Sequence, residues 1–171
     1  MLNFRTVIAL LSLVLLFSCS KPKPQLPSNK GRMTDKSIAQ LLEMNQKLTL
    51  KEDSLLLQYV ENSDQKFTKN ELGFWYIISK TTQKAKLKDK EAFRFDCKMS
   101  LLNGKLLKSE IKAVSLGKKE LVQGLEEALK LMHKGESATF VIPWYLAYGM
   151  KGNGKLIPPY TSLIYEVKLF E

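Results

Sequence analysis

Apolar residues between positions 33 and 66 recur at the spacing of helices and gather on two faces. Thr49 and Glu52 have the spacing of a capping box, which predicts two helices that meet near Leu48. One long helix is the alternative, because neither Gly nor Pro lies there. The two faces are formed by Ile38, Leu41 and Leu42, and by Leu55, Leu56, Tyr59 and Val60.

From residue 67 onward the pattern becomes that of β-strands. Residues 73–78 are aromatic and β-branched, which is typical of a strand. Asn103-Gly104 predicts a tight hairpin, with its return strand over residues 106–116. Two further segments alternate apolar with polar residues, which indicates strands with one face exposed to water. Their apolar positions are Phe93, Phe95 and Cys97 in the first segment, and Leu163, Tyr165, Val167 and Leu169 in the second.

Residues 116–159 combine a helix, a strand and a loop. An apolar stripe predicts an amphipathic helix, and His133 and Gly135 are typical of its end. Residues 138–142 are apolar and partly β-branched, which predicts a strand buried on both faces. The loop that follows has aromatic residues beside glycines and can fold over a small pocket. The helical stripe is Leu121, Val122, Leu125, Ala128, Leu129 and Met132, and the loop aromatics are Trp144, Tyr145 and Tyr148.

Composition excludes several classes of function. The chain has 171 residues, a formal net charge of +10, one His and two Cys, too few His and Cys for a structural zinc site. We expect His133 to serve as a cation at a helix end, and Cys97 to be buried without a disulfide partner. The scattered lysines indicate a solvated basic surface, with an anionic membrane face as the alternative. We expect no metal, no cofactor and no nucleic-acid partner.

The first 32 residues have the pattern of an exported lipoprotein. In residues 1–18, Arg5 precedes an apolar run too short to span a bilayer as a stable helix. The sequence Leu-Phe-Ser-Cys that ends at Cys19 looks like a bacterial lipobox, which predicts an acylated Cys19 that anchors the chain to an envelope membrane. Residues 19–32 are rich in Pro and polar residues, which indicates a flexible tether. Lysines rather than acidic residues follow Cys19, so we expect a periplasm-facing lipoprotein.

Several short motifs occur in order along the second part of the chain. They are Leu116-Gly117-Lys118, residues 122–129, Met132 with Gly135-Glu136, Ala147-Tyr148-Gly149 and Ile157-Pro158-Pro159. Each is unspecific alone, but in this order and at these spacings they resemble the FK506-binding-protein family of peptidyl-prolyl cis-trans isomerases. The resemblance covers roughly residues 74–171. It implies an α+β fold in which an antiparallel β-sheet wraps around one short helix.

The resemblance also implies an organisation and a set of partners. A helical leader over residues 33–66 would precede the isomerase domain over residues 67–171. Similar leaders in exported members of the family can pair two chains, so a homodimer through residues 33–66 is one expectation. Packing of the leader on its own domain is the other. The substrates would be proline-containing polypeptides.

Prolyl isomerisation needs no nucleophile, metal or cofactor, which suits a chain with few such groups. By resemblance, the Tyr148 hydroxyl donates to a substrate carbonyl, and the backbone N–H of Val122 binds another carbonyl. The pocket residues implied by the resemblance are Cys97, Leu107, Leu121, Leu125, Leu156, Ile157 and Tyr165. The aliphatic residues among them would line the proline pocket; the alternative is that they only fill the hydrophobic core.

The chain departs from the family pattern at several pocket positions. Leu125 stands where the family usually has Trp, and Cys97 where it usually has Tyr. The pattern looks most like the gliding-motility-associated lipoprotein isomerases of the Bacteroidetes. Two hypotheses therefore stand: an exported isomerase of weakened activity that assists envelope proteins, or a non-enzymatic chaperone or binding module that retains the fold. The other departures are Leu107 and Lys108 for Phe-Asp, Lys112 for Phe and Asn153 for His.

Overall fold

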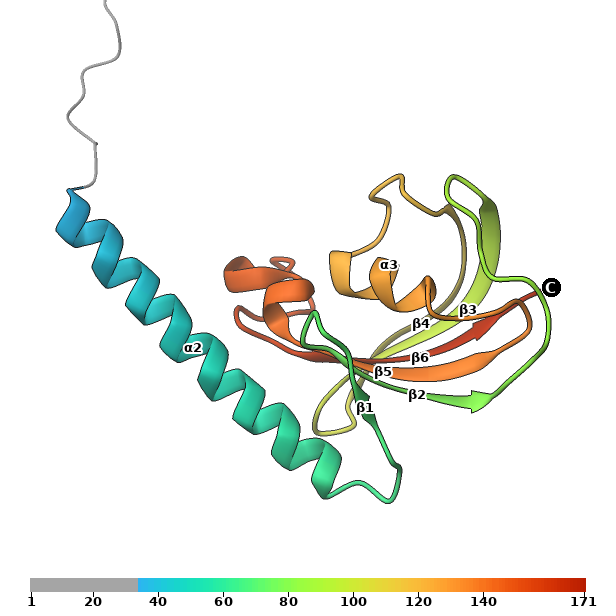
Figure 1. Ribbon diagram of the computed structural model, residues 1–171, viewed down its shortest axis with the longest axis horizontal. Coiled ribbons are helices and arrows are strands. Elements are labelled where there is room, and N and C mark those ends of the chain that lie inside the picture. Colours follow the sequence, from blue (N-terminus) through green and yellow to red (C-terminus); the bar gives the residue numbers. More distant parts are fainter. Residues whose placement is uncertain (1–33) are drawn as a thin grey trace, which may run out of the picture. The chain divides into compact units, whose positions relative to one another are not determined.

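One antiparallel sheet organises the part of the chain that the structure, a computed structural model, describes, which is residues 34–171. Within it, Leu41–Glu171 form one compact unit. The strand order is β1-β2-β5-β6-β3-β4, and every neighbouring pair is antiparallel. The sheet curves around the short helix α3 (Gln123–Leu129), as Figure 1 shows. The strands are β1 (Thr68–Lys69), β2 (Trp75–Lys80), β3 (Ala92–Leu101), β4 (Leu106–Ser115), β5 (Ser137–Ile142) and β6 (Leu163–Leu169).

The inner face of the sheet and α3 share the main core. On β3, Phe93, Phe95 and Cys97 are buried while their neighbours are more exposed, which confirms the predicted alternation. Tyr165 and Val167 of β6 lie in the same core, with Leu125 and Leu129 of α3. Removing this much apolar surface from water stabilises the fold, at about 25 cal/mol per Å². The predicted sheet wrapped around one short helix is thereby confirmed.

The outer face of the sheet is covered in part by a second helix. Val141 and Ile164 point away from the main core, yet both are buried. They pack in a second cluster with Leu56 and Val60 of α2 (Asp35–Glu61). This packing explains why β5 carries consecutive apolar residues instead of an alternating pattern. It also shows that the latter part of the leader helix packs on its own domain.

α2 is one uninterrupted helix, so the predicted pair of helices is wrong and the single-helix alternative is correct. The Thr49 hydroxyl donates to the carbonyl oxygen of Asn45 at 3.0 Å, a bond within the helix and not a cap. Glu52 is buried with 8% of its surface exposed. It therefore meets the folded domain rather than a helix start.

The end of α3 differs from the expected one. The helix stops at Leu129, so His133 lies beyond its last turn, and the prediction of a helix-terminal cation is wrong. His133 instead contacts the buried Glu136, with Nδ1 and Oε1 3.2 Å apart. Gly135 has a φ of +79°, which confirms the expected left-handed turn. Gly104 also has a positive φ, +83°, in the turn of the hairpin between β3 and β4.

Several expectations lie outside the described residues. They are the signal peptide over 1–18, the acylated Cys19 and the tether over 19–32. The boundary between a leader ending at 66 and a domain starting at 67 stays a prediction. Within residues 34–171, no helix is both long enough and apolar enough to cross a membrane.

Candidate active site

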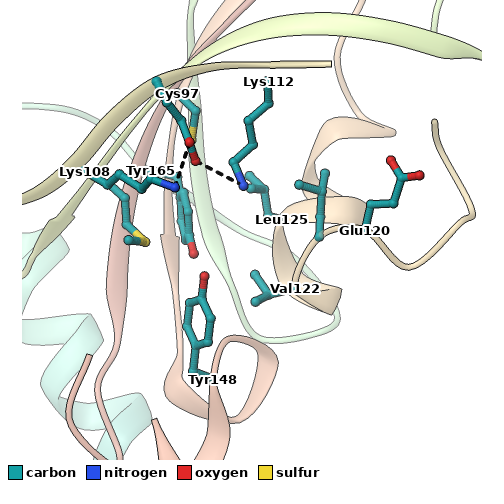
Figure 2. A pocket seen from close by; sticks show the side chains of 11 residues that line it. Cys97, Lys108, Lys112, Glu120, Val122, Leu125, Tyr148 and Tyr165 are labelled. Atoms are coloured by element: carbon teal, nitrogen blue, oxygen red, sulfur yellow. Dashed lines mark ion pairs between the residues drawn. The ribbon is translucent and has the colours of Figure 1, made fainter. Parts of the chain in front are cut away.

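A pocket of about 220 Å³ opens between α3, the β3–β4 hairpin strands and the loop after β5 (Figure 2). Its lining is apolar at the base and charged along one wall. The lining residues are Cys97, Met99, Lys108, Glu110, Lys112, Glu120, Leu121, Val122, Leu125, Tyr148 and Tyr165.

The base of the pocket is built from three different elements. Leu125 comes from α3, Cys97 from β3 and Tyr165 from β6, and each is at most 3% exposed. Cys97 and Tyr165 lie on neighbouring strands, which hold them at fixed positions on the inner face. Burial raises the pKa of the Cys97 thiol to about 11, so the thiol is neutral at pH 7. Burial likewise raises the pKa of Tyr165. The base is therefore uncharged.

Two tyrosine hydroxyls face each other across the pocket. Figure 2 shows the Tyr148 ring pointing toward Tyr165, hydroxyl to hydroxyl. Tyr148 lies between two short 3₁₀ helices, η2 (Trp144–Leu146) and η3 (Gly149–Lys151). A half-buried phenol in this place can donate a hydrogen bond to a bound carbonyl group.

The N-terminus of α3 meets the pocket at Val122. This residue is extended, with φ −65° and ψ 147°, and its carbonyl oxygen accepts the Glu126 N–H at 3.0 Å. Among the described residues, no side chain caps the start of α3. The first N–H groups of a helix have no partner within it, so donors are available at this end of the pocket.

One wall of the pocket carries three charged residues of β4. Lys108, Glu110 and Lys112 alternate along the strand, so they share the face toward the pocket. The Glu110 carboxylate pairs with the Lys108 ammonium at 2.7 Å and with that of Lys112 at 3.2 Å, as the dashed lines in Figure 2 show. The bond from Lys108 lowers the pKa of Glu110 below its usual value. The wall is polar and ionised at neutral pH.

The structure brings together most of the site residues expected from the sequence. Leu107 is half-buried and packs against the main core, while its neighbour Lys108 takes the pocket-facing position. The predicted pocket positions of Leu107, Leu156 and Ile157 are therefore not observed. The expected residues that do line the pocket are Cys97, Leu121, Val122, Leu125, Tyr148 and Tyr165.

A tight turn explains why Leu156 and Ile157 lie elsewhere. The Asn153 side-chain oxygen accepts three backbone N–H groups in succession, including that of Ile157 at 2.8 Å. The turn sends Ile157 into the core at 2% exposure and leaves Leu156 55% exposed. Gly152 permits this turn, because a Cβ there would overlap the Ile157 carbonyl oxygen.

Some lining residues were missed from the sequence. Met99 lies two residues beyond Cys97 on the same strand face, so the period of two could have found it. The same period along Lys108, Glu110 and Lys112 could have predicted a charged wall. Glu120, by contrast, reaches the pocket through a turn whose geometry the sequence pattern does not give.

The side chains of residues 34–171 do not offer a metal site. No group of three or more His, Cys, Asp and Glu is close enough together to hold an ion.

Residues 83–170 match the family described as FKBP-type peptidyl-prolyl cis-trans isomerase. The Macrophage infectivity potentiator of Trypanosoma cruzi is 46% identical over 50 residues, which cover 29% of this chain and 26% of that protein. The probable FKBP-type peptidyl-prolyl cis-trans isomerase of Haemophilus influenzae is 28% identical over 122 residues, or 70% and 50% of the two chains. This chain thus spans half or less of the length of these two relatives.

Solved structures share the fold at low sequence identity. FkpA from Escherichia coli superposes with a TM-score of 0.62 at 22% identity, over 99% of this chain and 82% of that one. A peptidyl-prolyl cis-trans isomerase from Pseudomonas syringae gives 0.58 at 21% identity, over 81% and 98%. These likenesses concern the fold alone.

Proposed function

The chain belongs to the family of FKBP-type peptidyl-prolyl cis-trans isomerases, and on this premise we propose that it catalyses cis-trans isomerisation of X-Pro bonds in polypeptides. The observation that carries the proposal is the uncharged base of the pocket, with Tyr148 positioned above it. A pocket of about 220 Å³ is smaller than the roughly 300–1,000 Å³ of most small-molecule sites. It suits one prolyl ring.

The proposed mechanism has no covalent step. The barrier to rotation, about 18–20 kcal/mol, comes from amide resonance. In the twisted transition state the amide loses charge separation, so an apolar base of Leu125 and Tyr165 favours it over the planar ground state. The Tyr148 hydroxyl and the Val122 backbone N–H hold the flanking carbonyl groups. This differential binding lowers the barrier.

The proposed activity is weaker than that of a family member with an aromatic pocket. Leu125 supplies no ring against the substrate proline, and such ring contacts are worth about 0.5–1.5 kcal/mol. The ionised wall of Lys108, Glu110 and Lys112 also holds water, which an entering apolar group must displace. A combined deficit of about 1.5–3 kcal/mol corresponds to a rate roughly ten- to a hundredfold lower.

The alternative is a non-enzymatic chaperone or binding module. The charged wall favours it, because two lysines and a carboxylate suit the binding of polar chain segments without selecting a twisted amide. A protease-coupled isomerisation assay on the full-length protein separates the two. The isomerase proposal predicts a rate that rises in proportion to protein concentration. A rate equal to the uncatalysed one, together with measurable binding of unfolded polypeptide, would support the alternative.

The N-terminal sequence supports a proposal about location. The residues that end at Cys19 look like a lipobox, and we infer that a lipid anchor holds the domain in the periplasm, where it would assist folding of envelope proteins. Mass spectrometry of the mature N-terminus should find a diacylated or triacylated Cys19. An intact Met1 would contradict the anchor.

A second copy of this chain is a further proposed partner. The C-terminal part of α2 is occupied by its own sheet, but Ile38, Leu41 and Leu42 are 40–58% exposed on the preceding turns. Burying these side chains against another α2 would remove apolar surface from water. Light scattering should give the mass of a dimer, and Leu42→Glu should give that of a monomer. A monomeric wild type would contradict the pairing.

A further inference from the structure

The long helix α2 contacts the loop that carries Tyr148. Glu52 and Asp53 lie on this helix, outside the segment 83–170 that matches the family. The Ser162 hydroxyl donates to the Glu52 carboxylate and accepts the Trp144 N–H at 2.8 Å. These contacts join residues that are 110 and 18 positions apart in the chain. They fix the start of η2 to α2.

The neighbouring acidic residue makes a second connection. The Tyr145 hydroxyl donates to Asp53 Oδ1 at 3.1 Å, and the other oxygen of Asp53 pairs with Lys69 at 3.2 Å. Gly73, with φ +102°, leaves room for this hydroxyl, because a Cβ there would lie 2.5 Å from it. Burial raises the pKa of Tyr145, so it remains a neutral donor.

Glu52 is costly to bury, which argues for a specific role. It lies at 8% exposure, one turn before the apolar Leu56, and Ser162 beside it is 5% exposed. A buried carboxyl group destabilises the fold unless hydrogen bonds satisfy it. Here the bond leads directly to the backbone of Trp144, so the polar pair specifies where η2 sits.

The opposite side of η2 is held by α3. A Cβ on Gly124 would lie 2.9 Å from the Leu146 Cβ, so Gly124 permits unusually close packing of α3 on this loop. Residues 144–146 are therefore held between α2 and α3. Tyr148 follows two residues later, with few dihedral angles in between. A shift of Tyr145 would move the Tyr148 hydroxyl in the pocket.

We propose that Glu52 and Asp53 are positioning residues: they hold the 144–148 loop so that Tyr148 faces the pocket, and α2 thereby sets the rate of isomerisation. The statement about rate rests on the proposed isomerase function. The statement about the loop does not.

Kinetics of full-length variants test the effect on rate. Glu52→Ala and Asp53→Ala should each lower kcat about three- to tenfold, the range for one lost hydrogen bond, with KM changed less than about twofold. Asp53→Asn retains an acceptor for Tyr145 and should recover most of the loss. Glu43→Ala is the matched control, because Glu43 is an exposed residue of the same helix, paired with Lys47 at 2.8 Å. It should leave kcat unchanged.

Hydrogen exchange tests the loop without any need for activity. Backbone amides of residues 144–149 should exchange faster in Glu52→Ala and Asp53→Ala than in wild type or Glu43→Ala. Unchanged exchange in both variants overturns the inference. The inference is also overturned if the variants exchange faster than wild type but keep the wild-type kcat, with both quantities measured well below the melting temperature of each variant. An inactive wild type whose loop exchange still rises in the variants would contradict the proposed function alone and support the positioning role.

Discussion

Glu136 shows how a buried carboxyl group can stabilise this fold. It is 2% exposed, and its oxygens accept the backbone N–H groups of Thr82 at 3.0 Å and His133 at 2.8 Å. Burial alone would raise the pKa of Glu136, but these bonds outweigh it and lower the pKa below the ordinary value of 4.5. The stabilising effect is therefore complete above pH 4.5 and is lost as the pH falls through the lower folded-state pKa.

We predict that Glu136→Gln lowers the free energy of unfolding by about 1–3 kcal/mol at pH 7, because the amide NH₂ faces a backbone donor. The variant should also lose less stability than wild type as the pH falls below 4.5, because it lacks the carboxyl group whose pKa is lowered. Denaturant titrations at several pH values measure both effects. Glu71→Gln is the control, since Glu71 is an exposed residue. Equal stability of Glu136→Gln and wild type at pH 7 would refute the prediction.

Leu125 is the residue whose replacement should raise activity. It forms the apolar base of the pocket but offers a prolyl ring no aromatic face. Leu125→Trp should increase kcat/KM about two- to tenfold, provided that thermal melting shows the larger ring is accommodated without overpacking. A stable variant with unchanged or lower kcat/KM would mean that the base does not limit the rate.

At the scale of elements, sequence patterns predicted what depends on local spacing. Phe95 and Cys97 on β3, and Tyr165 and Val167 on β6, alternate with polar neighbours, and this pattern correctly predicted which face of each strand points inward. The same reasoning left open whether the leader packs on its own domain or on a second chain, and it did not find the role of Glu52, because its partner Ser162 is 110 residues away. Contacts between distant elements leave no periodic signal in the chain.

The sequence predicted some of the pocket residues but not others. Tyr148 and Leu125 follow from motifs, and both line the pocket. Leu156 follows the family pattern in sequence, but the Asn153 turn points it to solvent. The charged wall arises because Lys108 rather than Leu107 faces the pocket. That choice depends on the shifted register at Met99–Ser100, where β3 and β4 pair irregularly.

The packing of α2 on the sheet should be a large source of stability. Leu56 is fully buried against Val141 and Ile164. Leu56→Ala should lower the free energy of unfolding by about 2–5 kcal/mol, the usual cost of such a cavity. Leu50→Ala, at a position 67% exposed on the same helix, should change it by less than about 0.5 kcal/mol. Denaturant unfolding measures both changes. A change for Leu56→Ala as small as that for Leu50→Ala would mean that α2 is not docked on the sheet.

At the scale of the whole molecule, the described chain combines a family domain with a helix that reaches both its sheet and its pocket loop. Residues 41–171 form one compact unit, which includes α2 from Leu41 onward. Its hydrogen bonds to Ser162 and Tyr145 connect the outer face of the sheet to the pocket. Through these bonds, the docking of α2 on the sheet can determine how the loop that carries Tyr148 is positioned at the pocket.

Tyr148→Phe compared with Tyr160→Phe in the isomerisation assay tests whether the Tyr148 hydroxyl donates a hydrogen bond to a substrate carbonyl group during catalysis. Tyr160 is 45% exposed and packs edge-to-face with Trp144 outside the pocket, so it controls for loss of a phenol hydroxyl from the same region. Removing one hydrogen bond to the transition state should lower kcat/KM about five- to tenfold in Tyr148→Phe. Tyr160→Phe should remain at the wild-type value. Equal kcat/KM for Tyr148→Phe and wild type would mean that the Tyr148 hydroxyl takes no part in catalysis.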